Sequence, residues 1–186
     1  MYQEPKHITS SYTLNNIGKT IYETVIKYKP KKIIDFGVLY GYSTVCLAQG
    51  VRDNGFGEII AYDLFEDYKY KKGNKDVVLN NLKLYNLEKY VTIIKKDFND
   101  WLNEKEKFDL LHLDISNTGD IIQSIYNHYT NSLIMFEGGS EERDNIDWMV
   151  RFNKPKINKS KVTFTILNPK FPSISIINNK NYSYEK

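Results

Sequence analysis

The sequence has little of what builds a disulfide-linked, metal-clustered or membrane-spanning protein. It contains one cysteine, Cys46, so a disulfide framework within the chain is excluded and a cysteine-based zinc site is disfavoured. No apolar run approaches the roughly 20 residues that a transmembrane helix needs. The opening residues, 1–6, also lack the apolar stretch of a signal peptide. These absences predict a cytoplasmic protein with no membrane partner.

The sequence also has only a small excess of positive over negative charge. The 26 lysines and arginines nearly balance the 23 aspartates and glutamates, which leaves a net charge of +3. Nucleic-acid binding needs clustered basic charge, so this composition gives no reason to expect a nucleic-acid partner. A length of 186 residues with 41% hydrophobic residues suits one globular domain. We therefore predict one domain over residues 1–186, with residues 1–31 as an N-terminal helical segment.

Strand and helix patterns alternate along most of the chain. Nearly continuous β-rich apolar runs predict strands at residues 32–36, 58–62, 91–94, 108–113 and 132–136. Helical spacing predicts helices at residues 17–28, 42–49, 76–90, 100–102 and 119–129. This alternation is typical of a doubly wound, Rossmann-like α/β sheet with mostly parallel strands. Two further runs, 161–167 and 173–177, flank a short proline-containing loop and predict an antiparallel C-terminal hairpin.

Five of the predicted strands end in or near a carboxylate. These residues are Asp35, Asp63, Asp97, Asp114 and Glu137. Parallel strands place their carboxyl ends along one edge of the sheet, where such folds bind ligands. Aspartate also caps helices and begins turns, so any single one of the five could be structural. Their equivalent positions together favour a ligand site.

The loop after the first predicted strand carries two glycines, Gly37 and Gly41, in the sequence GVLYGYS. Glycine permits positive φ and a close backbone approach. The loop leads into a helix N-terminus, whose free N–H groups favour an anionic group of a ligand. Asp63 ends the next strand, the position at which an acidic residue binds ribose hydroxyls. These features indicate a nucleoside ligand, and by themselves they do not separate S-adenosylmethionine (SAM) from NAD.

Residues 33–44, IIDFGVLYGYST, resemble motif I of the class I SAM-dependent O-methyltransferases in the catechol and caffeoyl-CoA branch. Residues 108–114, FDLLHLD, resemble the fourth-strand motif of that branch and of bacterial small-molecule and sugar O-methyltransferases. The resemblance extends from about residue 32 to residue 139. It implies a seven-stranded, mostly parallel sheet with an antiparallel strand, SAM as cofactor, and O-methylation of a small-molecule or sugar hydroxyl.

The resemblance also implies roles for particular residues. At the methionine end of SAM it places Asp35, Gly37, Gly41 and Ser43. It assigns binding of the ribose to Asp63 and places Asp97 and Phe98 beside the adenine. Asp114 lies near the transferring methyl, where it would orient or deprotonate the acceptor hydroxyl. His112, within an apolar strand, is interpreted as a packed core histidine.

Metal dependence is the point at which the chain departs from the resemblance. In the metal-dependent branch a lysine follows the fourth-strand aspartate by three residues, and here that position is Asn117. The fifth strand ends in Glu137-Gly138 in place of Asp-Asn or Asp-Asp. Asp114 and Glu137 are candidates to share Mg²⁺, which binds through few carboxylates, but a third protein ligand is missing. The metal-independent alternative is favoured.

Two other functions stay open. A SAM-binding protein or subunit with little catalysis of its own would suit the departures at Asn117 and Gly138. An NAD-dependent oxidoreductase is disfavoured because no G-x-G-x-x-G pattern is present. The acceptor is not identified, and contacts with it are considered for Arg143 and Trp148. Homo-oligomerisation is left open, since a partner subunit could complete the pocket.

Overall fold

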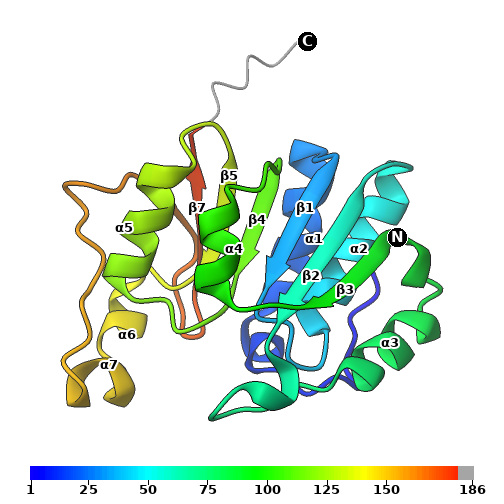
Figure 1. Ribbon diagram of the computed structural model, residues 1–186, viewed down its shortest axis with the longest axis horizontal. Coiled ribbons are helices and arrows are strands. Elements are labelled where there is room, and N and C mark those ends of the chain that lie inside the picture. Colours follow the sequence, from blue (N-terminus) through cyan, green and yellow to red (C-terminus); the bar gives the residue numbers. More distant parts are fainter. Residues whose placement is uncertain (180–186) are drawn as a thin grey trace.

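One mixed sheet organises the molecule, and its strand order locates the ligand edge (Figure 1). The computed structural model describes residues 1–179, so the last seven residues of the predicted 1–186 domain lie outside the described part. Within it, seven strands take the order β3-β2-β1-β4-β5-β7-β6. They are β1 Lys32–Phe36, β2 Glu58–Asp63, β3 Val91–Lys95, β4 Leu110–Leu113, β5 Leu133–Glu137, β6 Thr165–Asn168 and β7 Ile174–Asn178.

The sheet confirms the predicted fold class. Strands β1 to β5 are parallel, while β7 runs antiparallel to both β5 and β6. From central β1 the chain first builds outward through β2 and β3, then returns to β4 on the other side. The order therefore reverses between β1 and β4, which makes their carboxyl ends the topological switch point where such sheets bind ligands.

Helices cover both faces of this sheet (Figure 1). One apolar core lies between the sheet and α1 Ile17–Tyr28, α2 Tyr42–Asn54 and α3 Lys75–Leu84. The other core includes side chains of α4 Phe98–Glu104 and α5 Gly119–His128. The remaining helices are α6 Glu141–Asp144, α7 Asp147–Arg151 and the 3-10 turns η1 Ser11–Asn15, η2 Phe65–Asp67 and η3 Glu88–Tyr90. No helix among residues 1–179 is both long and apolar enough to span a bilayer.

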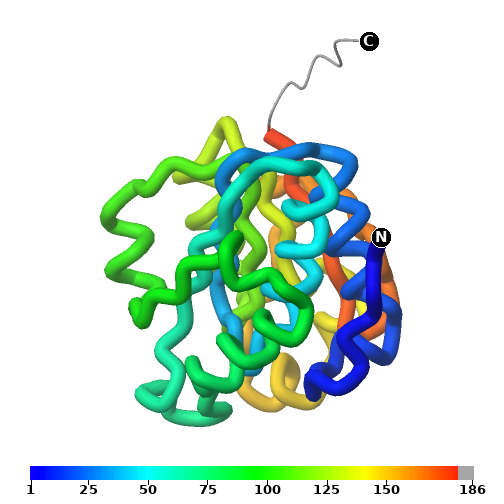
Figure 2. Tube along the Cα trace, turned by 90° about the vertical axis from the view of Figure 1, so that its right-hand side faces the viewer, coloured from blue at the N-terminus to red at the C-terminus, as the bar shows by residue number. Residues whose placement is uncertain are grey.

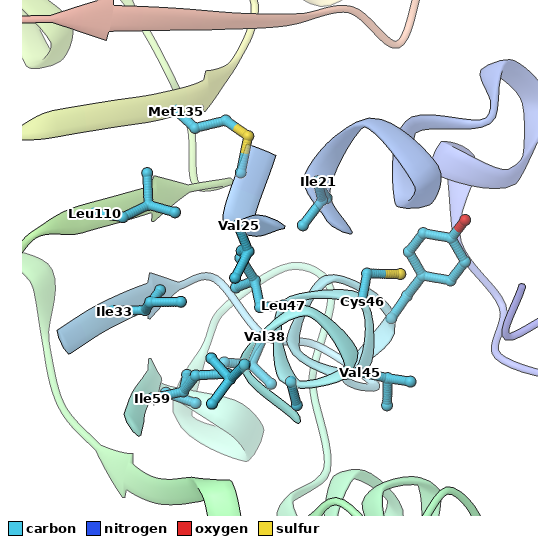
Figure 3. Close-up of a cluster of buried hydrophobic side chains, with 14 of the residues drawn as sticks. Ile21, Val25, Ile33, Val38, Val45, Cys46, Leu47, Ile59, Leu110 and Met135 are labelled. Carbon is cyan, nitrogen blue, oxygen red and sulfur yellow. The ribbon is translucent and has the colours of Figure 1, made fainter. Parts of the chain in front are cut away.

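The first core shows why the helical spacing of the sequence was informative. Ile21 and Val25 of α1 are fully buried with strand residues such as Ile33 (Figure 3). Each such side chain contributes about 1.5–3 kcal/mol on burial. Helix α1 also packs closely on α2, because a Cβ at Gly50 would lie only 2.6 Å from Val25 Cβ. Packing of this kind fixes α2, and with it the loop that precedes α2.

Several predicted boundaries differ from the structure. Helix α2 continues past Gln49 to Asn54 and ends where Gly55 adopts φ 79°. The predicted helix 76–90 is divided, because Asn86 takes a left-handed φ of 54° between α3 and η3. The predicted strand 161–167 is shorter as well: β6 begins at Thr165, and its pairing with β7 has a register shift near Asn168.

The first 16 residues form an N-terminal strap that runs along one flank of the molecule (Figure 2). The Met1 amino group lies 2.6 Å from the Asp53 carboxylate. The backbone of Gln3 exchanges two hydrogen bonds, of 2.6 and 2.8 Å, with the side-chain amide of Gln49. The strap then passes into η1, where Tyr12 is buried. The strap is therefore anchored on α2 before it reaches η1.

Candidate functional site

The loop between β1 and α2 is shaped by its two glycines. Gly37 has φ 92° and Gly41 has φ 87°, which is the left-handed region that favours glycine. A Cβ at Gly37 would lie 2.0 Å from the carbonyl oxygen of Asp114, so no side chain fits there. A Cβ at Gly41 would meet Val78 at 2.9 Å. The loop therefore lies directly against the end of β4, at the switch point of the sheet.

Asp63, at the end of β2, holds this loop in place. Its Oδ2 accepts hydrogen bonds from the backbone N–H groups of Val38 at 2.7 Å and Leu39 at 2.9 Å. Its Oδ1 accepts from Phe65 N–H at 2.6 Å. A carboxylate offers roughly four acceptor positions, so one stays open on this half-buried side chain. The sequence suggested a ribose contact for Asp63 but gave no sign of this second role in the loop.

Asp35 lies below the first turn of α2 and is completely buried. Its carboxylate accepts hydrogen bonds from Thr44 Oγ1 at 2.6 Å and from Ser43 Oγ at 3.3 Å. His112, the neighbouring residue on β4, hydrogen-bonds the same carboxylate through Nδ1 at 2.7 Å. The structure thus brings Asp35 and Ser43 together, and it gives the buried His112 a polar partner inside the core. These contacts connect β1, β4 and α2.

Asp97 and Phe98 lie at the end of β3. Asp97 caps α4, because its Oδ1 accepts from Asn99 N–H at 2.7 Å. The ring of Phe98 packs edge-to-face on Phe36, with centroids 5.3 Å apart. Asp97 also lines an open surface cavity of about 600 Å³, together with Leu64, the residue after Asp63. The second and third strand ends therefore share a hollow on the carboxyl edge.

Asp114 and Glu137 end the next two strands. Strand alternation places Asp114 on the same face as His112, two residues before it. Asp114 retains some exposure, whereas Glu137 is only 7% exposed. Burial raises the pKa of the Asp114 carboxyl, while His112 opposes that rise. Burial likewise raises the pKa of Glu137 to about 7, against the opposing charge of Arg143.

Tyr12 of the N-terminal strap covers these strand ends. Its ring lies edge-on to His112, with centroids 6.1 Å apart. Its hydroxyl lies near Asp114 without a hydrogen bond of normal geometry to any described residue. The sequence analysis did not find Tyr12, because no motif links a tyrosine in the N-terminal segment to strands that follow much later.

A buried arginine, Arg143, pairs with Glu137. Arg143 Nε lies 2.8 Å from both carboxylate oxygens of Glu137. Arg143 Nη2 donates to the carbonyl of Asn117 at 3.4 Å, and Asn117 Nδ2 donates to the carbonyls of Leu113 and Glu137. Arg143 is thus buried among protein groups. Among residues 1–179, no group of three or more histidine, cysteine, aspartate or glutamate side chains is arranged to hold a metal ion.

One sequence signal could have located Arg143. A serine is a favoured helix N-cap, and the Oγ of Ser140 does accept from Arg143 N–H at 3.1 Å. The cap puts Arg143 in the first turn of α6, six residues after Glu137. Trp148 then packs on the guanidinium, with 5.3 Å from Cζ to the ring centroid.

Comparison with known proteins identifies the family to which this geometry belongs. A family model described as a methyltransferase domain matches residues 34–135, which is more than half of the chain. The chain belongs to this methyltransferase family. The matched span runs from β1 to β5, so it contains the glycine loop and the ends of four parallel strands. No curated protein matches the chain in sequence.

Solved structures of methyltransferases share the fold. An O-methyltransferase from Bacillus cereus in complex with SAH is 18% identical, with a TM-score of 0.59 and coverage of 94% of this chain and 84% of that one. TomG, an O-methyltransferase from Streptomyces achromogenes in complex with SAM, is 14% identical, with a TM-score of 0.60 and coverage of 92% and 82%. A Geobacter sulfurreducens methyltransferase is also 14% identical, with a TM-score of 0.61 and coverage of 87% and 77%. At such low identity these similarities establish the fold.

Proposed function

We propose that this methyltransferase transfers the methyl group of SAM to a hydroxyl oxygen of a small molecule or sugar. The observation that carries the proposal is the match of the methyltransferase domain to the part of the chain that builds the carboxyl edge of the sheet. Two O-methyltransferases of the same fold are complexes with SAM or SAH, its demethylated product S-adenosylhomocysteine, which supports SAM as the cofactor here.

The proposed SAM position follows the strand ends in order. Its methionine end lies against the loop from Gly37 to Ser43, above the buried Asp35. Its ribose hydroxyls use the open acceptor position of Asp63. Its adenine lies toward Asp97 and Phe98, where the surface cavity opens. This arrangement directs the sulfonium and its methyl group toward Asp114, whose negative charge favours a cation.

Methyl transfer on this edge needs correct placement and the removal of one proton. The acceptor oxygen attacks the methyl carbon, the carbon–sulfur bond breaks, and its electron pair stays on sulfur to give SAH. Holding the two reactants in line contributes about 7–11 kcal/mol. The acceptor proton passes to Asp114, and its raised pKa makes it a better base than an exposed aspartate.

A turnover assay tests the proposal. The purified full chain is incubated with SAM and a panel of catechols, hydroxy acids, phenols and sugars, and SAH formation is measured. We expect SAH above the rate without acceptor for at least one hydroxyl compound, and none when that hydroxyl is removed. SAM binding without turnover on any member would favour the alternative of a SAM-binding protein or subunit with little catalysis.

We also propose that the chain forms one domain over residues 1–186 and works in the cytoplasm. In the described part, contacts from the N-terminal strap and the C-terminal hairpin converge on one sheet, which supports the single domain. The sole cysteine, Cys46, is a buried free thiol, as is common in a reducing compartment.

A further inference from the structure

The carboxylate pair that could have held a metal ion already has a cation beside it. Glu137 contacts Arg143 Nε through both oxygens, and the two side chains are 7% and 4% exposed. The positive charge of Arg143 also opposes the burial-driven rise in the pKa of Asp114, so it acts on both candidate ligands. The residues present therefore do not fit the divalent ion of the metal-dependent branch.

Several contacts hold this guanidinium in place. The backbone N–H of Arg143 donates to Ser140 Oγ, and its Nη2 donates to the carbonyl of Asn117. The ring of Trp148 packs on the guanidinium. An ion bound to Glu137 would have to displace the arginine and leave its charge buried without a partner. Removing one member of a buried ion pair is strongly destabilising, because it leaves an uncompensated buried charge. Coordination by Glu137 is thus opposed by the packing of α6.

Two buried hydrogen-bond donors lie beside this pair. Arg143 Nη1 has no hydrogen-bond partner among the described residues. The Tyr12 hydroxyl interacts with Asp114 but makes no hydrogen bond of normal geometry within residues 1–179. Buried donors are almost always satisfied, and an unsatisfied donor next to the strand ends indicates a polar ligand atom.

We propose that Arg143 is a built-in cation that takes the place of a divalent metal ion next to Asp114 and Glu137. This inference rests on the proposed methyl transfer. The acceptor oxygen accepts hydrogen bonds from Arg143 Nη1 and the Tyr12 hydroxyl, and Asp114 takes its proton as the bond to the methyl carbon forms. The reaction then needs no metal ion, and the acceptor presents an oxygen atom to these two donors.

Titration with Mn²⁺, followed by electron paramagnetic resonance, tests the occupant of the site directly. The free Mn²⁺ signal is measured with the full wild-type chain, with and without SAM, and with the Asp114→Asn and Glu137→Gln variants. We expect the wild type to bind no more Mn²⁺ than either variant does. One Mn²⁺ per wild-type chain that is lost in either variant would overturn the proposal. Mn²⁺ that all three proteins bind equally lies elsewhere and supports it.

An Arg143→Lys variant tests the donor role separately. Lysine keeps the charge beside Glu137 but lacks the guanidinium fork, so SAM affinity and the folded circular dichroism spectrum should persist. Turnover on an acceptor identified in the panel should fall by about tenfold or more, in kcat and not only through KM, and Mn²⁺ should not restore it. Unchanged kcat would exclude the donor role. Failure of SAM to bind would refute the proposed function, while the Mn²⁺ titration would still report on the site.

Discussion

The proposed cofactor half of the carboxyl edge, built by β1, β2 and β3, differs in construction from the proposed acceptor half at β4 and β5. In the cofactor half, one carboxylate, Asp63, organises a glycine loop through backbone hydrogen bonds, and the surface stays open near Asp97. In the acceptor half, Tyr12 and Arg143 are buried at the strand ends, and Arg143 Nη1 has no hydrogen-bond partner within residues 1–179. In our proposal the first half holds the cofactor, while the second carries the features that would select an acceptor.

The largest effect should separate chemistry from binding. Asp114→Asn should reduce methyl transfer by about 10²–10⁴-fold, because asparagine cannot take the acceptor proton. SAM affinity should fall far less than turnover, since most of the proposed cofactor contacts lie on other strands. Steady-state kinetics and calorimetry on the same preparation check both expectations. A fully active variant would refute the role of Asp114, and lost SAM binding would show that the two halves are not independent.

The next effect concerns stability in the acceptor half. Arg143→Met should lower the free energy of unfolding by about 3–5 kcal/mol, because it leaves the Glu137 carboxylate buried alone. Urea denaturation measures this, with Arg151→Met as a matched control on the exposed side of α7. An equal decrease in the free energy of unfolding for both substitutions would mean that burial of the ion pair does not add to stability.

In the cofactor half, Asp63→Ala should weaken SAM binding by about 1.5–3 kcal/mol through loss of hydrogen bonds to a charged acceptor. It should also lower the melting temperature, because the amides of Val38 and Leu39 lose their acceptor. Asp67→Ala is the matched control, since Asp67 is nearby but exposed and pairs with Lys95. Unchanged SAM affinity in folded Asp63→Ala protein would reduce Asp63 to a loop anchor.

A further effect is a pH dependence of stability that belongs to the acceptor half. The folded pKa of Glu137 is raised to about 7, so the folded state holds a proton that the unfolded chain releases. This contribution is complete below the unfolded pKa of about 4.3 and is lost as the pH rises through the folded value. The free energy of unfolding should therefore decrease as the pH rises between those two pKa values. The decrease should be smaller in the Glu137→Gln variant. Identical pH profiles would contradict the raised pKa.

The same contrast explains what the sequence could predict. The strands and the glycine loop depend on local patterns, so the fold class and the methyltransferase family were both predicted and are confirmed. The site residues of the cofactor half lie at strand ends, where topology alone brings them together. Their binding roles remain predictions.

The acceptor half depends on contacts between distant segments. Asn15 of η1 donates to the carbonyls of Lys170 and Pro172 in the hairpin loop, and it accepts from Asn168 Nδ2. No short motif encodes such contacts, and this is why the sequence analysis missed Tyr12 and considered Arg143 only for contact with the acceptor. The predicted helix boundaries were wrong for a similar reason. The left-handed conformation of a residue such as Asn86 depends on the packing of the segments around it.

Calorimetric titration of the wild-type chain with SAM, SAH and NAD tests the central claim most directly. The glycine loop, the Asp63 anchor and the family match predict saturable binding of SAM and SAH, in the micromolar range, and no binding of NAD. Binding of NAD without binding of SAM would contradict the account.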